Sequence, residues 1–430
     1  MDLELVTIGD ELLLGFTIDT NAAHLARELA AVGVRISRRS TVGDNPDVIA
    51  QAVREALDRT GAVITTGGLG PTADDRTKPV IGGIFGRTMV LDEDILTALE
   101  TRWRKRFGVA LPVSNRQQAM VPSDAVILTN NHGSAPGIWL EDEEGRWVAM
   151  LPGVPREMRG MLADTLLPRV RDRINTSDQR EPTVVRSRTL RTANIAESAL
   201  ADRLGDLAVG VNGLALAFLP GNEGVDLRLT VDGIPAAEAE QQLNIAAALI
   251  AAKVDAFIYG NEQDDMASIV LALCAERGAT VAVAESCSGG LLGSRFTAIP
   301  GSSAIFQGGV ISYHNDSKTR DLGVHPDTIK RVGAVSEETA RAMASGVRQR
   351  FGTTIGLAIT GIAGPGGGTP EKPVGTVWVA VDLAGEVEAI RAMMPGDRNE
   401  MRYRSTQLVL DRLRRALMKL PASAGWTADD

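Results

Sequence analysis

The segment TVAVAESCSGGLL, Thr280–Leu292, decides the fold of the last third of the chain. Its first five residues form a short apolar run typical of a buried strand, and its end opens an apolar helical pattern. Between them, the polar turn Glu285–Gly290 places backbone N–H groups and hydroxyls at a helix N-terminus, where anions and developing oxyanions are stabilised. From this segment alone, capping of the helix by Ser286 or Ser288 is the favoured interpretation. The same turn is also a natural position for a nucleophile, and Ser286 is the candidate.

A phenol and an amine follow the next apolar strand, in the segment Ile311–Lys318. We expect Tyr313 and Lys318 to lie near the C-terminal edge of the same sheet. A serine becomes nucleophilic when a neighbouring base accepts its proton, and burial lowers the pKa of a lysine so that it can be that base. Lys318 is therefore the candidate base, and the competing interpretation is an exposed helix residue.

A glycine-rich loop, Thr360–Thr369, follows the predicted strand Thr354–Ile359. Glycine permits close approach of the backbone to a ligand, and successive N–H groups form a nest for phosphate. The loop lacks the Gly-Lys-Ser/Thr of a Walker loop, so it predicts a phosphate cradle of another kind. A flexible linker is the competing interpretation, and the strands on both sides count against it.

Several ordered segments of the last third resemble the C-terminal domain of the CinA family. They are Ala284–Gly290, Pro300–Ser303, Gly308–Val310, Tyr313–Asn315, Gly333–Glu337, Thr360–Gly367, Glu371–Val377 and Gly396–Arg398. The resemblance implies a nicotinamide-nucleotide amidohydrolase, which converts nicotinamide mononucleotide and water to nicotinate mononucleotide and ammonia without a cofactor. It also implies that Ser286 is the nucleophile and that Tyr313 and Lys318 activate it.

The same resemblance, together with the chemistry of the turn and loop, indicates the residues that bind substrate. Backbone N–H groups near Ser286–Gly290 would hold the oxyanion, and the glycine loop with Arg398 would hold phosphate or carboxylate. Relatives usually carry threonine at position 288, so Ser288 keeps the hydroxyl and lacks a methyl, which bears on affinity more than on activity. The substrate-binding candidates are Glu285, Ser288, Gly289, Gly290, Asn315, Thr360, Gly361, Ala363, Gly364 and Arg398.

The first 170 residues alternate predicted strands and helices, which favours a parallel sheet with helices on both faces. These elements are Leu3–Ile8, Thr20–Val32, Ile36–Thr41, Asp47–Thr60 and Ala62–Thr66, followed by a hairpin over Gly137–Leu151. Ligands of such sheets bind outside the C-terminal ends of the strands, where a glycine turn could cradle phosphate and acids could hold a divalent cation. The phosphate-binding candidates are Gly67, Gly68, Gly70, Pro71 and Thr72, and the metal-binding candidates are Asp10, Glu11, Asp44, Asp74 and Asp75. The competing interpretation is that these acids only cap and solvate helix starts.

This part of the chain resembles the molybdopterin-binding-like domain that opens CinA proteins. The resemblance implies metal-dependent ADP-ribose pyrophosphatase activity, which would place both ends of the chain in pyridine-nucleotide salvage. The alternative is a binding protein, for molybdopterin or for a competence partner, with a vestigial deamidase domain. The intact Ser286, Tyr313 and Lys318 count against that alternative.

A chain of 430 residues is too long for one ordinary domain. We expect two three-layer α/β/α domains with mainly parallel sheets, joined by a small α+β domain that includes a helix over Asn194–Leu204. The predicted boundaries are 1–175 for the molybdopterin-binding-like domain, 176–260 for the small domain, 261–420 for the deamidase domain and 421–430 for a flexible tail. In the last helix, Arg398–Leu420, the residues from Val409 on predict one apolar stripe and one solvated basic face.

Composition excludes several classes of protein. The net charge is -9 and no basic block with interleaved aromatics occurs, so we expect no direct nucleic-acid binding. No apolar run is long enough to span a bilayer and no signal peptide is evident, so we expect a cytoplasmic protein without membrane contact. The two cysteines and four histidines have no metal-ligand spacing. The family resemblance implies a homodimer that acts on small nucleotides.

Overall fold

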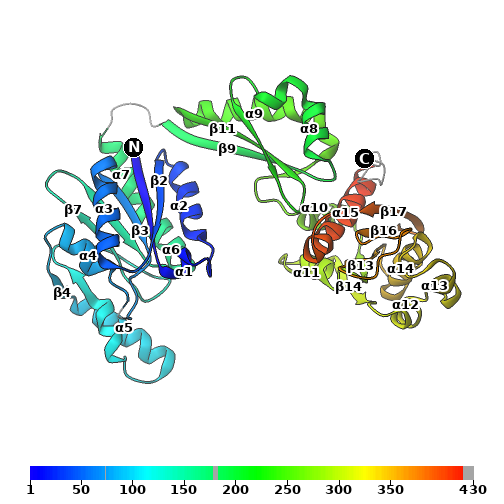
Figure 1. The fold of residues 1–430 in the computed structure, drawn as a ribbon, viewed down its shortest axis with the longest axis horizontal. Helices are drawn as coiled ribbons and strands as arrows, with labels where there is room; N and C mark the ends of the chain where they lie inside the picture. Colours follow the sequence, from blue (N-terminus) through cyan, green and yellow to red (C-terminus); the bar gives the residue numbers. More distant parts are fainter. Residues whose placement is uncertain (73, 178–182, 420–430) are drawn as a thin grey trace. The chain divides into compact units, whose positions relative to one another are not determined.

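The computed structural model describes residues 1–72, 74–177 and 183–419 (Figure 1). The predicted flexible tail 421–430 lies outside the described residues, as do residues 178–182 near the predicted start of the small domain. The chain forms two compact units, one of residues 1–186 and 231–241 and the other of residues 187–230 with the chain from 242 on. Within the described residues, no helix has the length and apolar character needed to cross a membrane.

The first unit is built on a six-stranded sheet in the order β2-β1-β3-β8-β7-β6. The pairs β1–β2, β1–β3 and β3–β8 are parallel, and the predicted hairpin β7–β8 is antiparallel. The strands of the first unit, inside and outside this sheet, are β1 (Asp2–Ile8), β2 (Arg35–Val42), β3 (Ala62–Thr66), β4 (Met89–Leu91), β5 (Met120–Pro122), β6 (Val126–Leu128), β7 (Gly137–Glu141) and β8 (Trp147–Leu151). Its helices are α1 (Asp10–Leu13), α2 (Thr20–Ala30), α3 (Pro46–Thr60), α4 (Thr77–Ile84), α5 (Glu93–Phe107), α6 (Pro155–Met161) and α7 (Leu167–Ser177), with shorter turns at Val113–Ala119 and Leu162–Leu166.

The central strand β1 shows why this unit has three layers. Leu3 and Leu5 pack into the core under α2, α6 and α7, while Val6 and Ile8 pack into a second core under α3 and α4. Side chains alternate between the two faces of a strand, so a continuous apolar run supplies both cores at once.

The second unit contains a small sheet in the order β10-β11-β9-β12 and a larger sheet in the order β14-β13-β15-β16-β17. The small domain comprises β9 (Thr183–Thr192), α8 (Glu197–Leu204), β10 (Ala215–Pro220), β11 (Val225–Pro235), α9 (Ala236–Val254) and β12 (Ile258–Asn261), with turns at Gly205–Val209 and Asp255–Phe257. The helix predicted from Asn194 begins only at Glu197, because Asn194 has a left-handed backbone (φ 55°) that a helix does not accommodate.

The larger sheet is parallel across β14, β13 and β15 and antiparallel across β15, β16 and β17. Its elements are α10 (Met266–Glu276), β13 (Val281–Glu285), α11 (Leu291–Thr297), β14 (Phe306–Ile311), α12 (Asn315–Leu322), α13 (Pro326–Val332), α14 (Glu337–Phe351), β15 (Ile355–Gly361), β16 (Thr376–Leu383), β17 (Glu386–Met393) and α15 (Arg398–Met418), with a turn at Ser302–Ala304. Val281 and Val283 of β13 face the core with α10, α11 and α15, and Ala282 and Ala284 face the core with α14. The predicted α/β fold class is confirmed.

The predicted solvated basic face of the last helix is wrong. Arg414 and Arg415 of α15 are buried, and each donates from Nε to the buried carboxylate of Asp411, at 2.9 and 2.8 Å. Both guanidinium groups also donate to the carbonyl oxygen of Ala256 at the end of the small domain. These acceptors offset the cost of removing two cations from water, and they fasten α15 to the small domain.

Candidate active site

Ser286 lies at the C-terminal end of β13, the strand between β14 and β15. Its backbone N–H donates to the carbonyl oxygen of Ile359 on β15 (2.9 Å), which extends the ladder of the sheet to the turn. Gly289 and Gly290 then adopt positive φ angles of 61° and 95° before α11 begins. Such angles favour glycine, so the sequence of the turn explains how the chain reverses sharply and leaves Ser286 at the sheet edge.

Glu285 holds this turn from beneath. It is 1% exposed, and its carboxylate accepts hydrogen bonds from the N–H groups of Gly290 (3.0 Å), Leu292 (3.0 Å) and Gly293 (2.8 Å). The carboxylate thus takes the anion position at the N-terminus of α11 that the sequence suggested for a ligand. Glu285 thus supports the turn, and its predicted part in substrate binding stays a prediction.

Lys318 lies directly against Ser286. Its Nζ is 3.1 Å from the Oγ of Ser286 and 2.7 Å from the carbonyl oxygen of Ser312, and the side chain is 1% exposed. The alternative that Lys318 is an exposed helix residue is therefore wrong. Burial lowers the pKa of Lys318 below the usual range of lysine, which increases the fraction of neutral amine near neutral pH. A neutral amine at this distance can accept the proton of a serine hydroxyl.

Two backbone N–H groups remain for an oxyanion. Within the described residues, the N–H groups of Cys287 and Ser288 have no backbone acceptor and lie against the Cys287 thiol, whereas the N–H of Gly289 donates to Ser286 O (3.2 Å). The Oγ of Ser288 is likewise buried without a partner in this part of the chain.

Burial raises the pKa of the Cys287 thiol to about 12, so it stays a neutral thiol and not a nucleophilic thiolate.

Tyr313 lies at the mouth of the site and not against the nucleophile. It is 62% exposed, and its phenol oxygen accepts from Nη2 of Arg398 (2.8 Å). In the described structure the phenol makes no hydrogen bond to Ser286 or Lys318, so its activating role stays a prediction. Nη1 of Arg398 donates to Gly364 O (2.7 Å), so this guanidinium connects Tyr313 to the glycine loop.

The glycine loop approaches the nucleophile turn closely. A Cβ on Gly361 would lie 3.1 Å from the Sγ of Cys287 and 2.9 Å from Thr376 O, so only glycine fits there. Thr360 is buried with its Oγ1 on Ala334 O (2.8 Å), which gives it a structural contact. Of the remaining candidates, Ala363 is nearly buried in the loop and Asn315 is exposed at the first position of α12.

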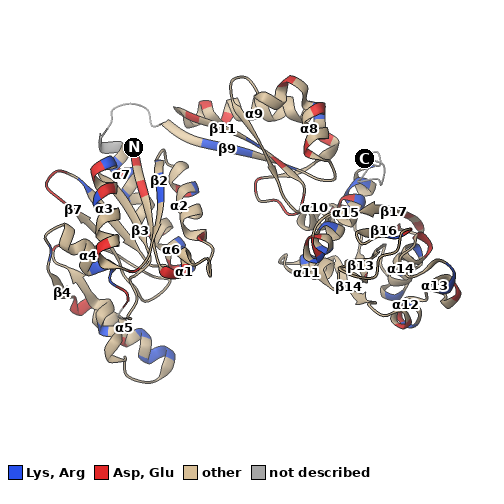
Figure 2. Ribbon diagram, in the orientation of Figure 1, with Lys and Arg blue, Asp and Glu red and all other residues tan. Residues whose placement is uncertain are grey.

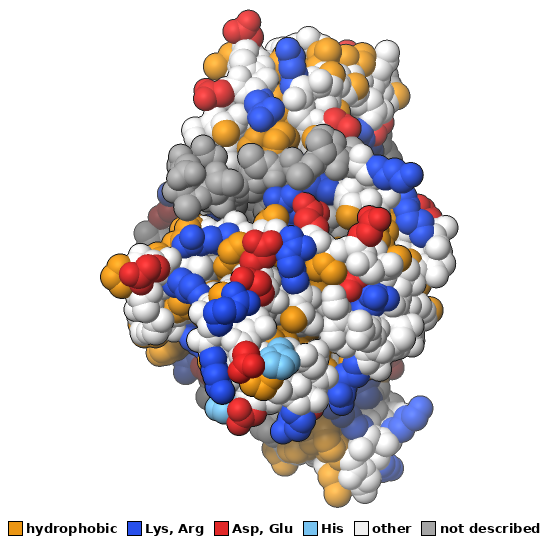
Figure 3. Space-filling view, turned by 90° about the vertical axis from the view of Figure 1, so that its right-hand side faces the viewer, with side chains coloured by type: hydrophobic (Ala, Val, Ile, Leu, Met, Phe, Trp, Pro, Cys, Tyr) orange, Lys and Arg blue, Asp and Glu red, His pale blue; other side chains and the backbone are white. Residues whose placement is uncertain are grey.

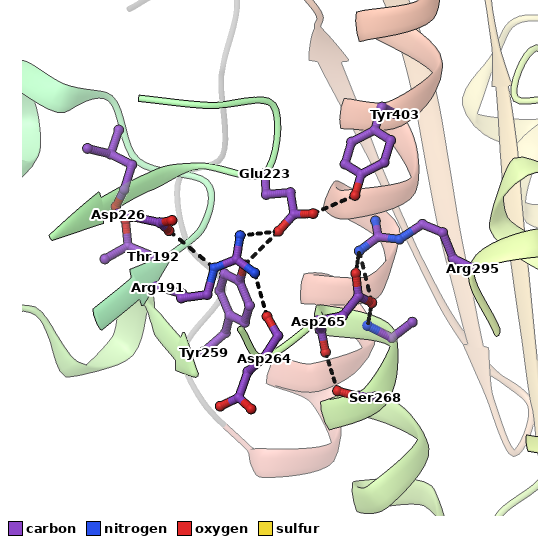
Figure 4. Close-up of polar contacts among 12 residues, drawn as sticks. Arg191, Thr192, Glu223, Asp226, Tyr259, Asp264, Asp265, Ser268, Arg295 and Tyr403 are labelled. Atoms are coloured by element: carbon purple, nitrogen blue, oxygen red, sulfur yellow. Dashed lines mark hydrogen bonds and ion pairs between the residues drawn. The ribbon is translucent and has the colours of Figure 1, made fainter. Parts of the chain in front are cut away.

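Helix α15 connects this site to the small domain, a role that no sequence motif indicated. Arg402 donates from Nε to Ser288 O (3.1 Å), on the nucleophile turn itself. One residue on, Tyr403 donates to Glu223 of the β10–β11 turn (2.5 Å), which also accepts from Arg191 and from Tyr259 (Figure 4). The groups that accept these hydrogen bonds lie far from Arg402 and Tyr403 in the sequence, so no local sequence pattern could predict the contacts.

A further contact in the same region fixes the position of α11. Arg295 on that helix donates to Asp265 (3.1 Å) and to Thr406 of α15 (3.0 Å), and its guanidinium lies 4.9 Å from the ring centroid of Tyr403 (Figure 4). Helix α11, which follows the nucleophile, is thus bound both to α15 and to Asp265.

The first unit contains a separate cavity of about 450 Å³ at the C-terminal ends of its strands. Its wall includes the predicted glycine turn and four of the predicted acids, which are Glu11, Asp44, Asp74 and Asp75. The glycines are required for packing, since a Cβ on Gly67 would lie 2.0 Å from Ile8 O and one on Gly68 2.0 Å from the Oγ1 of Thr77. The side-chain amide oxygen of Asn21, which also borders this cavity, is buried with no donor among the described residues.

Predicted phosphate-binding and metal-binding residues contact one another here. The carboxylate of Asp75 accepts from the N–H groups of Gly70 (2.7 Å) and Thr72 (2.8 Å). Asp44 accepts from the N–H of Asp10 (3.1 Å). Burial raises the pKa of Asp44, and the charges of Asp10, Glu11 and Asp74 act in the same direction, while the hydrogen bond from Asp10 opposes them. Pro71 borders the cavity without a polar contact to these groups.

These acids do not fit a metal site as they lie. Carboxylate oxygens are suitable ligands for a hard divalent cation. Across the described ranges, however, no group of three or more His, Cys, Asp or Glu side chains is arranged to hold a metal ion. The oxygens of Asp75 are already used by its own loop.

Comparison with known proteins covers the whole chain. Three family descriptions match in succession: "Probable molybdopterin binding domain" at residues 4–172, "Damage-inducible protein CinA KH domain" at 187–260 and "CinA C-terminal domain" at 263–417. A CinA-like protein from Gemmatimonas aurantiaca is 69% identical over 430 residues, which is 100% of both chains. A CinA-like protein from Kosmotoga olearia is 38% identical over 420 residues, 98% of this chain and 100% of its own. The crystal structure of a competence/damage inducible protein from Agrobacterium tumefaciens is 39% identical, covering 36% of this chain and 93% of its own, with a TM-score of 0.35.

Proposed function

Because the chain belongs to the CinA family, and because Ser286 and Lys318 form a buried pair, we propose that its C-terminal domain hydrolyses the carboxamide of nicotinamide mononucleotide. The products are nicotinate mononucleotide and ammonia. The observation that carries the proposal is the 3.1 Å contact between Nζ of Lys318 and Oγ of Ser286, out of solvent. A lysine in this environment is suited to be a base, and a surface lysine is not.

The proposed reaction has two covalent steps. Neutral Lys318 takes the hydroxyl proton of Ser286, and Oγ attacks the carboxamide carbon to give a tetrahedral oxyanion facing the N–H groups of Cys287 and Ser288. The C–N bond then breaks, the lysine proton passes to the leaving nitrogen, and ammonia departs from an ester on Ser286. Water, deprotonated by Lys318, attacks the ester, and the proton passes from Lys318 to Oγ as the carboxylic acid leaves and releases its own proton to solvent.

Substrate binding is proposed to involve the mouth of the site. Arg398 presents a guanidinium between Tyr313 and the glycine loop, where it can pair with the phosphate of a mononucleotide. The exposed ring of Tyr313 offers a surface against which a pyridine ring can lie. The exposed amide of Asn315 follows at the start of α12.

Ammonia release tests this function directly. Purified full-length protein is incubated with nicotinamide mononucleotide in the presence of EDTA, beside Ser286→Ala and, as a matched control, Ser294→Ala on α11. We expect release by the wild type and the control and a loss of at least about 1,000-fold in Ser286→Ala. Absence of release by the wild type, or equal release by Ser286→Ala, would refute the proposal.

For the N-terminal domain we propose a nucleotide substrate with a pyrophosphate, of which ADP-ribose is the example that the family suggests. The cavity at the strand ends and its acceptor-rich wall support a polar ligand. Since the acids are not arranged to hold a metal, no step is assigned to one here. AMP formation from ADP-ribose, measured with and without Mg²⁺ and in Asp44→Asn, decides whether hydrolysis occurs and whether a cation must be recruited.

We further propose that the protein acts in the cytoplasm as a homodimer, without contacting nucleic acid. Acidic and basic side chains are interspersed on the face seen in Figure 3. Such a distribution does not favour a polyanion. Light scattering on the purified chain tests the dimer, and retention on DNA at low salt would contradict the last part of the proposal.

A further inference from the structure

A second cavity in the first unit adjoins the one described above. Its volume is about 380 Å³, and it shares the lining residues Gln118, Ser134 and Glu157 with the larger cavity. The shared wall is firmly held, because the buried Lys78 donates from Nζ to the carbonyl oxygens of Gln117 (2.9 Å) and Gln118 (3.1 Å). The two cavities are therefore neighbouring compartments on either side of these three residues.

Aromatic rings from the end of α5 form one side of this second cavity. The rings of Trp103 and Phe107 lie 4.4 Å apart between centroids, and Phe107 is 51% exposed. The indole N–H of Trp103 is shielded from solvent and has no acceptor among the described residues. An exposed aromatic surface next to an unpaired donor is costly for a protein alone and suits a planar ligand that carries hydrogen-bond acceptors.

Arginines line the rest of the cavity. Arg102 and Arg156 donate only to carbonyl oxygens, of Asn130 (3.4 Å) and His132 (2.6 Å), and the guanidinium of Arg106 lies 5.2 Å from the Phe107 ring centroid. In the part of the chain that the structure describes, none of the three forms an ion pair with a carboxylate. Figure 2 shows the basic residues gathered toward the end of α5. A local excess of cations in a chain of net charge -9 favours an anionic ligand.

The larger cavity has the opposite character. Asp44 and Glu11 supply negative charge, and the unpaired oxygen of Asn21 supplies a further acceptor. These groups repel phosphate and accept hydrogen bonds from hydroxyls. A ligand that spans both compartments should therefore place its aromatic and phosphate part by the arginines and its hydroxyl-rich part by the acids.

We propose that the cavity around Trp103 and Arg106 binds the nucleoside phosphate part of a nucleoside diphosphate sugar. The base stacks against the aromatic pair, the phosphates pair with the arginines, and the distal sugar enters the acidic compartment. This deepens the nucleotide role proposed above for the N-terminal domain and rests on it for the choice of probes. It concerns binding alone and requires no hydrolysis.

Titration calorimetry on the full chain in EDTA tests the assignment, with AMP, ribose 5-phosphate and ADP-ribose as probes. We expect Trp103→Ala to weaken AMP and ADP-ribose at least about tenfold and to leave ribose 5-phosphate within twofold, whereas Trp103→Phe retains most of the affinity. Arg106→Gln should weaken all three probes about five- to tenfold. Arg104→Gln removes the same charge from the same turn of α5 but does not border the cavity, and it should have less than a twofold effect.

Other results overturn the proposal. If no probe binds the wild type, or if Trp103→Ala binds AMP normally, the base does not occupy this cavity. Equal effects of Arg104→Gln and Arg106→Gln would mean unspecific attraction to a basic surface. Should Trp103→Ala fail to fold, Trp103→Phe and Arg106→Gln carry the same test. If these binding results hold while ADP-ribose is never cleaved, the pyrophosphatase proposal fails and the binding site stands.

Discussion

The two candidate sites of this chain follow opposite designs. In the C-terminal domain, the reacting pair is buried, the base is shifted toward its neutral form by burial, and a carboxylate below the turn is already fully hydrogen-bonded. In the N-terminal domain, several acids border an open cavity, and burial together with neighbouring charges raises the pKa of one of them, Asp44. In the first site the carboxylate and the amine already have partners within the protein, whereas the acids of the second site border an open cavity.

The largest expected effect comes from removing the internal base. Lys318→Met should lower kcat/KM for nicotinamide mononucleotide by at least about 1,000-fold, because Lys318 Nζ is the proposed base and lies 3.1 Å from Ser286 Oγ. The change should not lower the melting temperature, since protonation of a buried lysine with a lowered pKa favours unfolding and the thioether removes that group. Lys330→Met on the exposed face of α13 is the control. A Lys318→Met enzyme with a tenth of normal activity would mean that Lys318 is not the base.

Removing the guanidinium at the mouth should have the next largest effect. Arg398→Ala should raise KM about 10- to 100-fold and change kcat less, because the side chain is proposed to bind phosphate and does not contact the reacting atoms. Initial rates over a range of substrate concentration measure both constants. Arg391→Ala, which removes an arginine that donates to Glu371 O, should be neutral. A large loss in kcat at unchanged KM would assign Arg398 to the chemical step instead.

The pH dependence of the deamidase should report the lysine. The proposed mechanism requires the neutral amine, so kcat/KM should fall about tenfold per pH unit below the pKa of Lys318 and level off above it. Because burial lowers that pKa, the plateau should begin well below the ordinary lysine value of about 10.4. Stopped assays in overlapping buffers measure the profile. A profile that keeps rising to pH 10.5 would mean that the amine is not desolvated in the working enzyme.

The smallest expected effect concerns the N-terminal site. Asp75→Asn keeps the side-chain shape but weakens the bonds from Gly70 and Thr72, so it should destabilise the first unit by about 1 to 2 kcal/mol. The same loss of negative charge should raise the affinity of the cavity for inorganic phosphate a few-fold. Chemical denaturation and calorimetry measure these two changes, with Asp58→Asn as the control, since Asp58 is exposed on α3 and does not border the cavity. Unchanged stability would contradict the view that Asp75 organises its own loop.

The parts of the molecule that local sequence determines were predictable. A buried apolar run, a glycine turn and an apolar helix specify where Ser286 lies, and the strand that follows places Lys318 at the same sheet edge. The three layers of the first unit follow from alternating strand and helix patterns in the same way.

Contacts between distant elements could not be predicted. Arg402 donates to the carbonyl oxygen of Ser288 from 114 positions away, and Lys318 donates to the backbone carbonyl oxygen of Ser312. The basic face of α15 is buried because Asp411 and Ala256 accept from it, which no helical periodicity reveals. The direction of the Glu285 carboxylate depends on N–H groups of a helix end and not on residue type.

The identity of the nucleophile is open to one direct measurement. Wild-type protein is mixed with nicotinamide mononucleotide, quenched in acid within milliseconds, digested and analysed by peptide mass spectrometry. We predict an adduct of substrate minus ammonia on Ser286, since its hydroxyl contacts the amine of Lys318, whose pKa is lowered by burial, and the neighbouring Cys287 thiol has a pKa raised to about 12. An adduct on Cys287, or turnover with no adduct on the peptide that contains both residues, would contradict the proposed serine mechanism.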